Sequence, residues 1–296
     1  MDFKEYQSKA LESDQVPSEK YREDLVEKIV PLLGLAGEAG GLLSEYKKHL
    51  RDGSAHKLFR ERISEELGDL LWYISNVASK FDLDLETIAK DNIDKVQERF
   101  VHKTTGASCY IFDKDFPENE TLPRRFTVEI KEITENESYR VQAFSDGEQV
   151  GSDLTDNAYH PDGYRFHDVF HLGYAAVLGW SPVTRQLLKR KRKSNPKIDE
   201  VEDGGRATAI EEGISALVFS YAEAHGFFEN VSELDYSLLK TIRYLSSRLE
   251  VGICSTGDWE RAILNGYKVW RQIRDHRGGR VILDLNQQTL EFEKLD

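Results

Sequence analysis

Five carboxylates occupy two apolar stretches near the start of the chain. Glu38 and Glu45 lie in the first stretch, and Glu65, Glu66 and Asp69 lie in the second. Residues three, four or seven positions apart share one face of an α-helix, so Glu38 and Glu45 share a face, as do Glu66 and Asp69. If the two helices pack antiparallel, three or four of these carboxylates converge and repel one another unless a hard cation lies between them. Oxygen-only ligands suit Mg²⁺ or Mn²⁺.

This region resembles the MazG-type, all-α nucleoside triphosphate pyrophosphohydrolases, whose signature is ExxE followed, after a spacer, by ExxD. Glu66-Leu-Gly-Asp69 fits ExxD, and Glu38-Ala-Gly-Gly41 fits ExxE except that Gly41 stands in place of the last Glu. Glu45 or Glu65 could partly replace the missing ligand. The resemblance covers roughly residues 1–105 and extends to the flanking residues Glu5, Tyr6, Gln7, Gly37, Trp72, Tyr73, Asn92, Lys95 and Arg99.

The resemblance implies hydrolysis of a (deoxy)nucleoside triphosphate to the monophosphate and pyrophosphate. Glu38, Glu66 and Asp69, helped by Glu45, would hold Mg²⁺ or Mn²⁺. Glu65 or Glu45 would orient or deprotonate the attacking water. A small helical bundle of this kind is expected to form a homodimer or homotetramer, as the family does. The expected substrate-binding residues are Asn92, Lys95, Arg99, Lys47 (or Lys48) and Trp72 (or Tyr73).

The periodicity of apolar residues divides the chain into two predicted domains. Residues 1–105 have helical periodicity and predict the MazG-like bundle. Residues 106–296 predict an α+β domain, with strands at about 108–152 and 280–293 and helices within 164–275. We expect the late strands to pair with the early ones in a small antiparallel sheet, so the fold class is mainly α.

Local signals refine these elements. Helices are predicted over residues 2–12, from Ser18 or Tyr21 to Glu45, over 57–79 and over 82–100. Pro31 is expected to kink or split the second of them. In the C-terminal domain, Ser145-Asp146-Gly147-Glu148 predicts a β-hairpin turn.

A second group of chemically active side chains lies in the C-terminal domain. His167 and His171 are one helical turn apart at the start of a predicted helix, with Asp168 between them, and this spacing can bind a metal. Glu211 and Glu212 lie on a later helix predicted over 206–228. Together they predict a second metal site or a general acid–base site; alternatively, they are hydrogen-bonded core residues. The His167-Asp168 pair, taken alone, resembles HD-type phosphohydrolases.

Charge and composition restrict the class of protein. The chain has 296 residues and a net charge of −13, which argues against general nucleic-acid binding. The two cysteines are far apart and lack metal-binding spacing, and no signal-peptide or membrane-spanning pattern is present, so we expect a cytoplasmic protein. The basic run at 189–193 could bind phosphates, but we expect it to form a solvated surface that pairs with the acidic run at 199–203.

Gly41 keeps other functions open. The N-terminal domain could be a catalytically degenerate nucleotide-binding or dimerisation domain, with a separate His/Asp/Glu hydrolase or metal site in the C-terminal domain. The two sites could also act in sequence, the second processing the monophosphate further. In a third hypothesis the C-terminal domain binds a protein partner.

Overall fold

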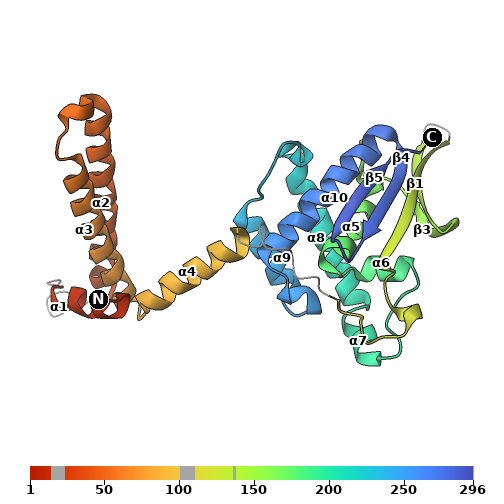
Figure 1. Ribbon diagram of the computed structural model, residues 1–296, viewed down its shortest axis with the longest axis horizontal. Helices are drawn as coiled ribbons and strands as arrows, with labels where there is room; N and C mark the ends of the chain where they lie inside the picture. The colour runs from red at the N-terminus through yellow and green to blue at the C-terminus, as the bar shows by residue number, and fades with distance from the viewer. Residues whose placement is uncertain (15–23, 101–110, 136–137, 296) are drawn as a thin grey trace. The chain divides into compact units, whose positions relative to one another are not determined.

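The computed structural model describes the chain except for residues 15–23, 101–110, 136–137 and 296 (Figure 1). It divides into two compact units, Met1–Val96 and Gln97–Asp296, which are described one at a time. The division falls within helix α4 (Leu85–Phe100). The domain boundary expected between residues 105 and 106 lies outside the described residues and stays a prediction.

A helical hairpin forms the N-terminal unit. Helix α2 (Asp24–Asp52) packs against α3 (Phe59–Lys80), and a short 3-10 turn, Gly53–Ala55, joins them. The expected start of α2 lies outside the described residues. Pro31 does not split α2, since the helix continues through it as one element to Asp52.

Gln7 connects the first helix to the rest of this unit. It lies on α1 (Phe3–Glu12), and its side-chain amide donates to Ser79 Oγ (3.1 Å) and to the Leu83 carbonyl (2.8 Å). Its side-chain oxygen accepts from the Leu85 backbone N–H (2.9 Å), at the start of α4. One side chain thereby fixes α1, the end of α3 and the start of α4.

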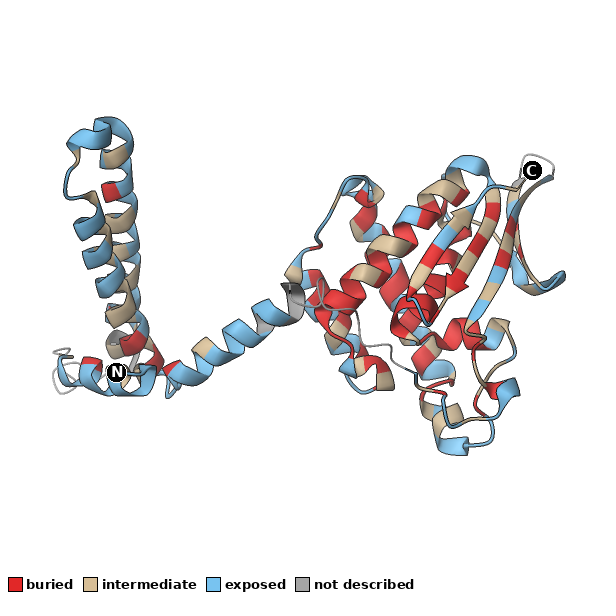
Figure 2. Ribbon diagram, viewed as in Figure 1, coloured by how far each residue is buried: buried red, intermediate tan, exposed pale blue. Residues whose placement is uncertain are grey.

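The hairpin leaves a large apolar surface exposed. Figure 2 shows burial concentrated in the C-terminal unit, whereas α2 and α3 are mostly exposed or intermediate. Among the described residues of the N-terminal unit, the buried apolar side chains are Ala10, Pro31, Ala78 and Leu85. This unit therefore has little core of its own. Leucines that are more than half exposed are Leu33, Leu43, Leu50, Leu58, Leu67 and Leu83.

The C-terminal unit contains a five-stranded antiparallel sheet in the order β3-β2-β1-β4-β5. The central strand β1 pairs with β4, with Val128 opposite Val281, so the predicted pairing of early and late strands is confirmed. At the predicted hairpin, Asp146 and Gly147 both have positive φ (52° and 81°), as a type I′ turn requires. The strands are β1 (Arg125–Glu135), β2 (Ser138–Ser145), β3 (Glu148–Leu154), β4 (Gly278–Asp284) and β5 (Thr289–Glu293).

The first strand begins later than expected. Residues 112–115 form a turn, residue 111 is not in a strand, and residues 108–110 lie outside the described part. Asp113 explains the difference, because its buried carboxylate accepts hydrogen bonds from the Leu122 backbone N–H and from Arg185. These contacts fold the segment back on itself, which an extended strand would not allow.

Helices α5 (Asp168–Leu178) and α10 (Thr256–His276) pack on each other and contact β4 and β5 (Figure 1). They cross at Gly173 and Gly266, where a Cβ on Gly173 would lie 3.3 Å from the Gly266 Cα. Every residue from Val169 to Leu178 is buried, so α5 is the centre of the core. The other helices are α6 (Pro182–Leu187), α7 (Pro196–Val201), α8 (Gly205–Glu223) and α9 (Tyr236–Ser246).

The basic run at 189–193 contains a buried residue. The Arg192 side chain is 1% exposed and its guanidinium lies 2.7 Å from Asp203 Oδ1 and 2.7 Å from Glu250 Oε1. The basic and acidic runs do pair, as expected, but this pair lies in the interior. The prediction of a solvated surface is therefore wrong at Arg192. Nearby, Arg185 pairs with Asp113 at 2.8 Å, with both side chains almost fully buried.

Asp113→Asn should destabilise the C-terminal unit by up to about 3–5 kcal/mol at pH 7, because the buried Arg185 guanidinium would lose the carboxylate 2.8 Å away and keep Asp203, at 3.8 Å, as its counter-charge. Burial raises the pKa of Asp113. The charge of Arg185 and the hydrogen bonds from the Leu122 N–H and Arg124 lower this pKa by a larger amount, so the net shift is downward. Burial and Arg192 lower the pKa of Arg185, yet a guanidinium remains charged at neutral pH. The measurement is urea unfolding of both proteins.

The pH dependence has a definite sign. A carboxyl group whose pKa is lowered by folding contributes stability above its unfolded pKa, and this is lost as pH falls through the folded pKa. The difference between wild type and Asp113→Asn should therefore shrink in acid. Asp115→Asn, at an exposed neighbouring position, is the control and should change stability by less than about 0.5 kcal/mol. Equal effects of the two substitutions would contradict the assignment.

Candidate functional site

Helices α2 and α3 bring the N-terminal carboxylates together. A Cβ on Gly34 would meet the Tyr73 ring, and a Cβ on Gly41 would lie 2.2 Å from Glu66 Oε2. From Gly34 to Gly41 the chain advances seven residues along α2, whereas the facing residues on α3 go back seven, from Tyr73 to Glu66. The two helices are therefore antiparallel. The same register places Glu38 level with Asp69. The Glu66 carboxylate occupies the space that a side chain at position 41 would take.

Glu66 is the electrostatic centre of this group. Its Oε2 atom is buried and has no hydrogen-bond partner among the described residues. Burial raises the pKa of Glu66, and the negative charges of Glu38, Asp69, Glu45 and Glu65 raise it further. A bound cation would relieve this repulsion and supply the missing partner. The all-oxygen donor set therefore fits a divalent hard cation such as Mg²⁺ or Mn²⁺.

Glu45 and Glu65 differ from Glu66 because each has a cationic partner. Glu45 accepts a hydrogen bond from Lys48 and lies 3.4 Å from His56 Nε2. The Lys48 hydrogen bond outweighs burial, and the pKa of Glu45 is lowered. Glu65 is exposed and accepts from Arg62 at 2.7 Å. Lys48 therefore favours the ionised form of Glu45, and Arg62 forms an exposed ion pair with Glu65.

The remaining N-terminal candidates are not brought together in the described structure. Asn92 and Lys47 are exposed, and the side chains of Lys95 and Arg99 lie outside the described residues. Trp72 is half-buried and donates its indole N–H to Ser13 Oγ at 2.8 Å. Its interaction with the end of α1 is consistent with a structural role, and its ring also meets Tyr73 edge to face.

The second predicted group does come together, at the start of α5. One potential ligand atom from each of His167, Asp168 and His171 lies within 4.8 Å of the others. No other described group of three His, Cys, Asp or Glu residues meets this criterion. The carboxylate oxygens of Glu38, Glu66 and Asp69 are therefore not all within 4.8 Å of one another. Glu211 and Glu212 on α8 complete the group, since their carboxylates contact the two nitrogens of His171.

Glu211 is held from three directions. The carboxylate accepts from Ser181 Oγ (2.6 Å) and from the Val183 backbone N–H (2.9 Å), and lies 2.8 Å from His171 Nδ1. Burial lowers the pKa of His171, but Glu211 and Glu212 outweigh it and raise the pKa to about 10. The sequence analysis did not include Ser181, although Ser181-Pro182 is a typical helix start and marks the N-cap of α6.

Tyr164 is another residue that the sequence analysis missed. It lies in a 3-10 turn, Tyr164–Phe166, directly before α5. Its ring stacks on His167 with centroids 4.4 Å apart, and its carbonyl oxygen lies 2.8 Å from His167 Nδ1. Only its position three residues before His167 could have suggested this contact.

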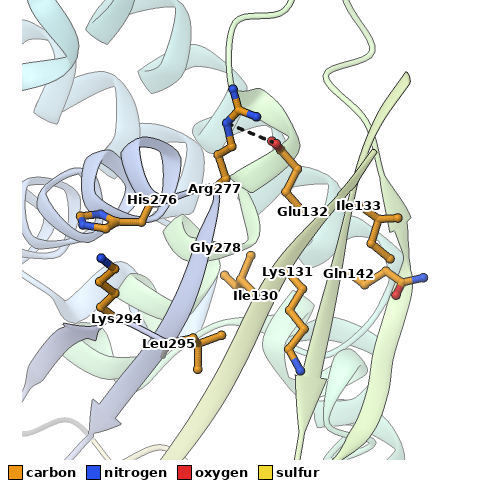
Figure 3. Close-up of a pocket in the computed structure, with 10 residues that line it drawn as sticks. All are labelled: Ile130, Lys131, Glu132, Ile133, Gln142, His276, Arg277, Gly278, Lys294 and Leu295. Carbon is orange, nitrogen blue, oxygen red and sulfur yellow. Dashed lines mark ion pairs between the residues drawn. The ribbon is translucent and has the colours of Figure 1, made fainter. Parts of the chain in front are cut away.

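The C-terminal unit also has a shallow pocket of about 370 Å³ next to β1 (Figure 3). Basic side chains line part of it, including Lys131, Arg277 and Lys294. Arg277 Nε lies 3.9 Å from Glu132 Oε1, so part of this charge is balanced. The pocket contains none of the predicted site residues.

Comparisons with known proteins assign both parts of the chain. Residues 31–104 match the MazG nucleotide pyrophosphohydrolase domain, an all-α class in agreement with the helical hairpin and its carboxylates. Residues 107–296 match the MazG C-terminal domain. The chain belongs to the MazG family, as its sequence motifs indicated.

A phage protein is similar to part of the chain. The Gene 37 protein of Mycobacterium phage L5 is 39% identical over 69 residues, or 23% of this chain. The chain spans 60% of the length of that curated relative. No solved structure matches the chain. None of the described helices is long and apolar enough to cross a membrane.

Gly41→Ala should lower the pKa of Glu66 toward the ordinary value for glutamate, because the new Cβ must push the flexible carboxylate out toward solvent. Gly40→Ala is the matched control, since a Cβ there meets nothing within 4 Å. The pKa would be measured by NMR titration of glutamate labelled with ¹³C at the side-chain carboxyl. An unchanged pKa in Gly41→Ala would show that Glu66 does not depend on the glycine.

Proposed function

We propose that the N-terminal unit hydrolyses a nucleoside triphosphate to its monophosphate and pyrophosphate with Mg²⁺ or Mn²⁺. The observation that carries this proposal is the buried Oε2 atom of Glu66, which has no hydrogen-bond partner in the described part of the chain and lies against Gly41 among the charges of Glu38 and Asp69. The match of residues 31–104 to a nucleotide pyrophosphohydrolase domain supports the class of substrate.

Glu38, Glu66 and Asp69 would hold the ion through their carboxylate oxygens. When bound, the ion neutralises phosphate charge and lowers the pKa of water. Glu45 is the stronger candidate for orienting the water or accepting its proton, because Lys48 favours its ionised form beside Glu66. Glu65 is the second candidate, although Arg62 already holds its carboxylate on the exposed side.

The substrate phosphates require cationic and polar groups outside the carboxylate cluster. Asn92, Lys95 and Arg99 are three and seven residues apart on α4 and so share one face of that helix. We assign them, with Lys47, to the phosphate oxygens. Trp72 is assigned to stacking on the base; its N–H is already engaged by Ser13, which would fix the plane of the ring.

The apolar surface of the hairpin supports a homodimer or homotetramer. Exposed leucines on a unit with few buried apolar residues are stabilised when a second surface covers them. Leu43 and Leu50 are 70% and 69% exposed and lie seven residues apart, on one face of α2. We propose that this face packs against another copy of the chain.

Product analysis tests the activity. Purified protein with Mg²⁺ should convert at least one canonical or modified (d)NTP to the monophosphate and pyrophosphate, as measured by chromatography. Glu66→Gln should lower the rate by about 100-fold or more, because it removes the charge that the ion requires. Glu61→Gln, an exposed position on the same helix, should leave the rate unchanged. Failure to hydrolyse any nucleotide would refute the proposed activity.

Light scattering coupled to size exclusion tests the oligomer. Wild-type protein should elute as a dimer or tetramer, and Leu43→Lys/Leu50→Lys should shift it toward the monomer, because two charges would have to be buried in the interface. Ile253→Lys, at a residue of the C-terminal unit that is 64% exposed, should not change the mass. A monomeric wild-type protein would contradict the proposed assembly.

A further inference from the structure

The start of α5 carries a group of ligand-type side chains that the proposed nucleotide chemistry does not use. His167 is the N-cap residue of α5, Asp168 is its first residue, and His171 follows one turn later. Their side chains are 10%, 13% and 0% exposed, so solvent competes little for their polar atoms. One potential ligand atom from each lies within 4.8 Å of the others.

Both histidines are oriented by acceptors at Nδ1. The Tyr164 carbonyl oxygen lies 2.8 Å from His167 Nδ1, and Glu211 Oε1 lies 2.8 Å from His171 Nδ1. A carbonyl oxygen and a carboxylate can only accept, so Nδ1 carries the proton in both rings. In the neutral imidazoles the lone pair is then on Nε2. Histidines that bind metals are typically fixed in this way by an outer carboxylate or carbonyl.

The Nε2 atoms face carboxylates without a proper hydrogen bond. His171 Nε2 is buried and has no hydrogen-bond partner among the described residues, and Glu212 Oε2 is 3.5 Å away. His167 Nε2 lies 3.9 Å from Asp168 Oδ1. These separations are too long for good hydrogen bonds. They are compatible with a shared ion, around which ligand atoms lie up to about 4.2 Å apart.

Glu211 has a different role from Glu212. Both of its oxygens are occupied, by Ser181 and His171 on Oε1 and by the Val183 N–H on Oε2. The Glu212 side chain is 42% exposed, and its Oε2 atom lies 3.5 Å from His171 Nε2. Glu212 can therefore move onto an ion that enters from solvent, whereas Glu211 is fixed and orients His171.

We propose that His167, Asp168, His171 and Glu212 bind one divalent transition-metal ion, with Glu211 and the Tyr164 carbonyl as its outer shell. Two imidazole nitrogens and two carboxylates suit Zn²⁺, Mn²⁺ or Fe²⁺ better than Mg²⁺ or Ca²⁺, which prefer oxygen. The ligands come from α5, the turn before it and α8, so the ion also links two core helices. The site belongs to the C-terminal unit and differs in ligand chemistry from the carboxylate site of the N-terminal unit.

Zinc binding to the full chain tests the proposal. The Glu66→Gln/Asp69→Asn variant, in which the N-terminal site is disabled, would be treated with chelator, incubated with Zn²⁺ and separated from free ion by gel filtration. We expect one zinc per chain by mass spectrometry of the metal, and a higher melting temperature than in the chelated protein. Replacement by Co²⁺ should give the visible absorption of a nitrogen- and oxygen-ligated ion.

Two substitutions address the ligands without disturbing the core. His167 lies at the N-cap of α5 with its side chain 10% exposed, and the Glu212 side chain is 42% exposed. His167→Gln and Glu212→Gln should each weaken zinc affinity by about tenfold or more. His225→Gln is the matched control, because His225 is an exposed histidine with similar local contacts. Its Nδ1 atom lies 2.7 Å from the Tyr221 carbonyl oxygen, and its ring stacks on the Tyr221 ring as the His167 ring stacks on Tyr164. Its zinc affinity should equal that of the parent.

Two results would overturn the proposal. The first is a chelated protein with an intact circular dichroism spectrum that retains no Zn²⁺ or Co²⁺ after gel filtration. In that case His171 would be a buried imidazolium between Glu211 and Glu212. The second is zinc affinity that is equal in His167→Gln, Glu212→Gln and His225→Gln, which would place the ion elsewhere. Neither result depends on turnover of a nucleotide.

Discussion

Two glycines of α2 determine how the large side chains of α3 lie against it. Gly34 accommodates the Tyr73 ring, and Gly41 accommodates the Glu66 carboxylate. A side chain at either position would force its partner away. Because the helices are antiparallel, these two contacts set a register that also places Glu38 level with Asp69. The carboxylate cluster therefore depends on close packing at Gly41 as much as on the acidic residues themselves.

This packing has an energetic cost that the rest of the N-terminal unit must offset. Glu66 is partly desolvated beside four other negative charges, which disfavours its ionised form and raises its pKa. The described part of the unit has few buried apolar side chains to compensate, and many of its leucines remain exposed. A bound cation and a second hairpin would remove the two sources of instability together. The C-terminal unit, in contrast, is built around a continuous core that includes nearly all of α5.

Local patterns in the sequence identified the helices and the chemical groups well. The helix predicted over 57–79 is found at Phe59–Lys80, and His167, Asp168 and His171 lie at a helix start as expected. Alternation failed at residues 111–113, because Asp113 is bound by Arg185, which is distant in the sequence. The burial of Arg192 could not be predicted either, because a run of basic residues does not indicate which of them has partners in the interior.

Gly41 illustrates why a motif can mislead when it is considered one position at a time. When only the sequence signature is considered, Gly41 indicates no more than the loss of a carboxylate. In three dimensions, the space it leaves is filled by the Glu66 carboxylate from the opposite helix, one oxygen of which is buried and without a hydrogen-bond partner where the chain is described. The substitution thus changes which groups surround the ion position and leaves a cluster of negative charge in place. Whether a position supplies a ligand or the space for one depends on the residues of the opposite helix. Those residues are known only once the packing of α2 against α3 is known.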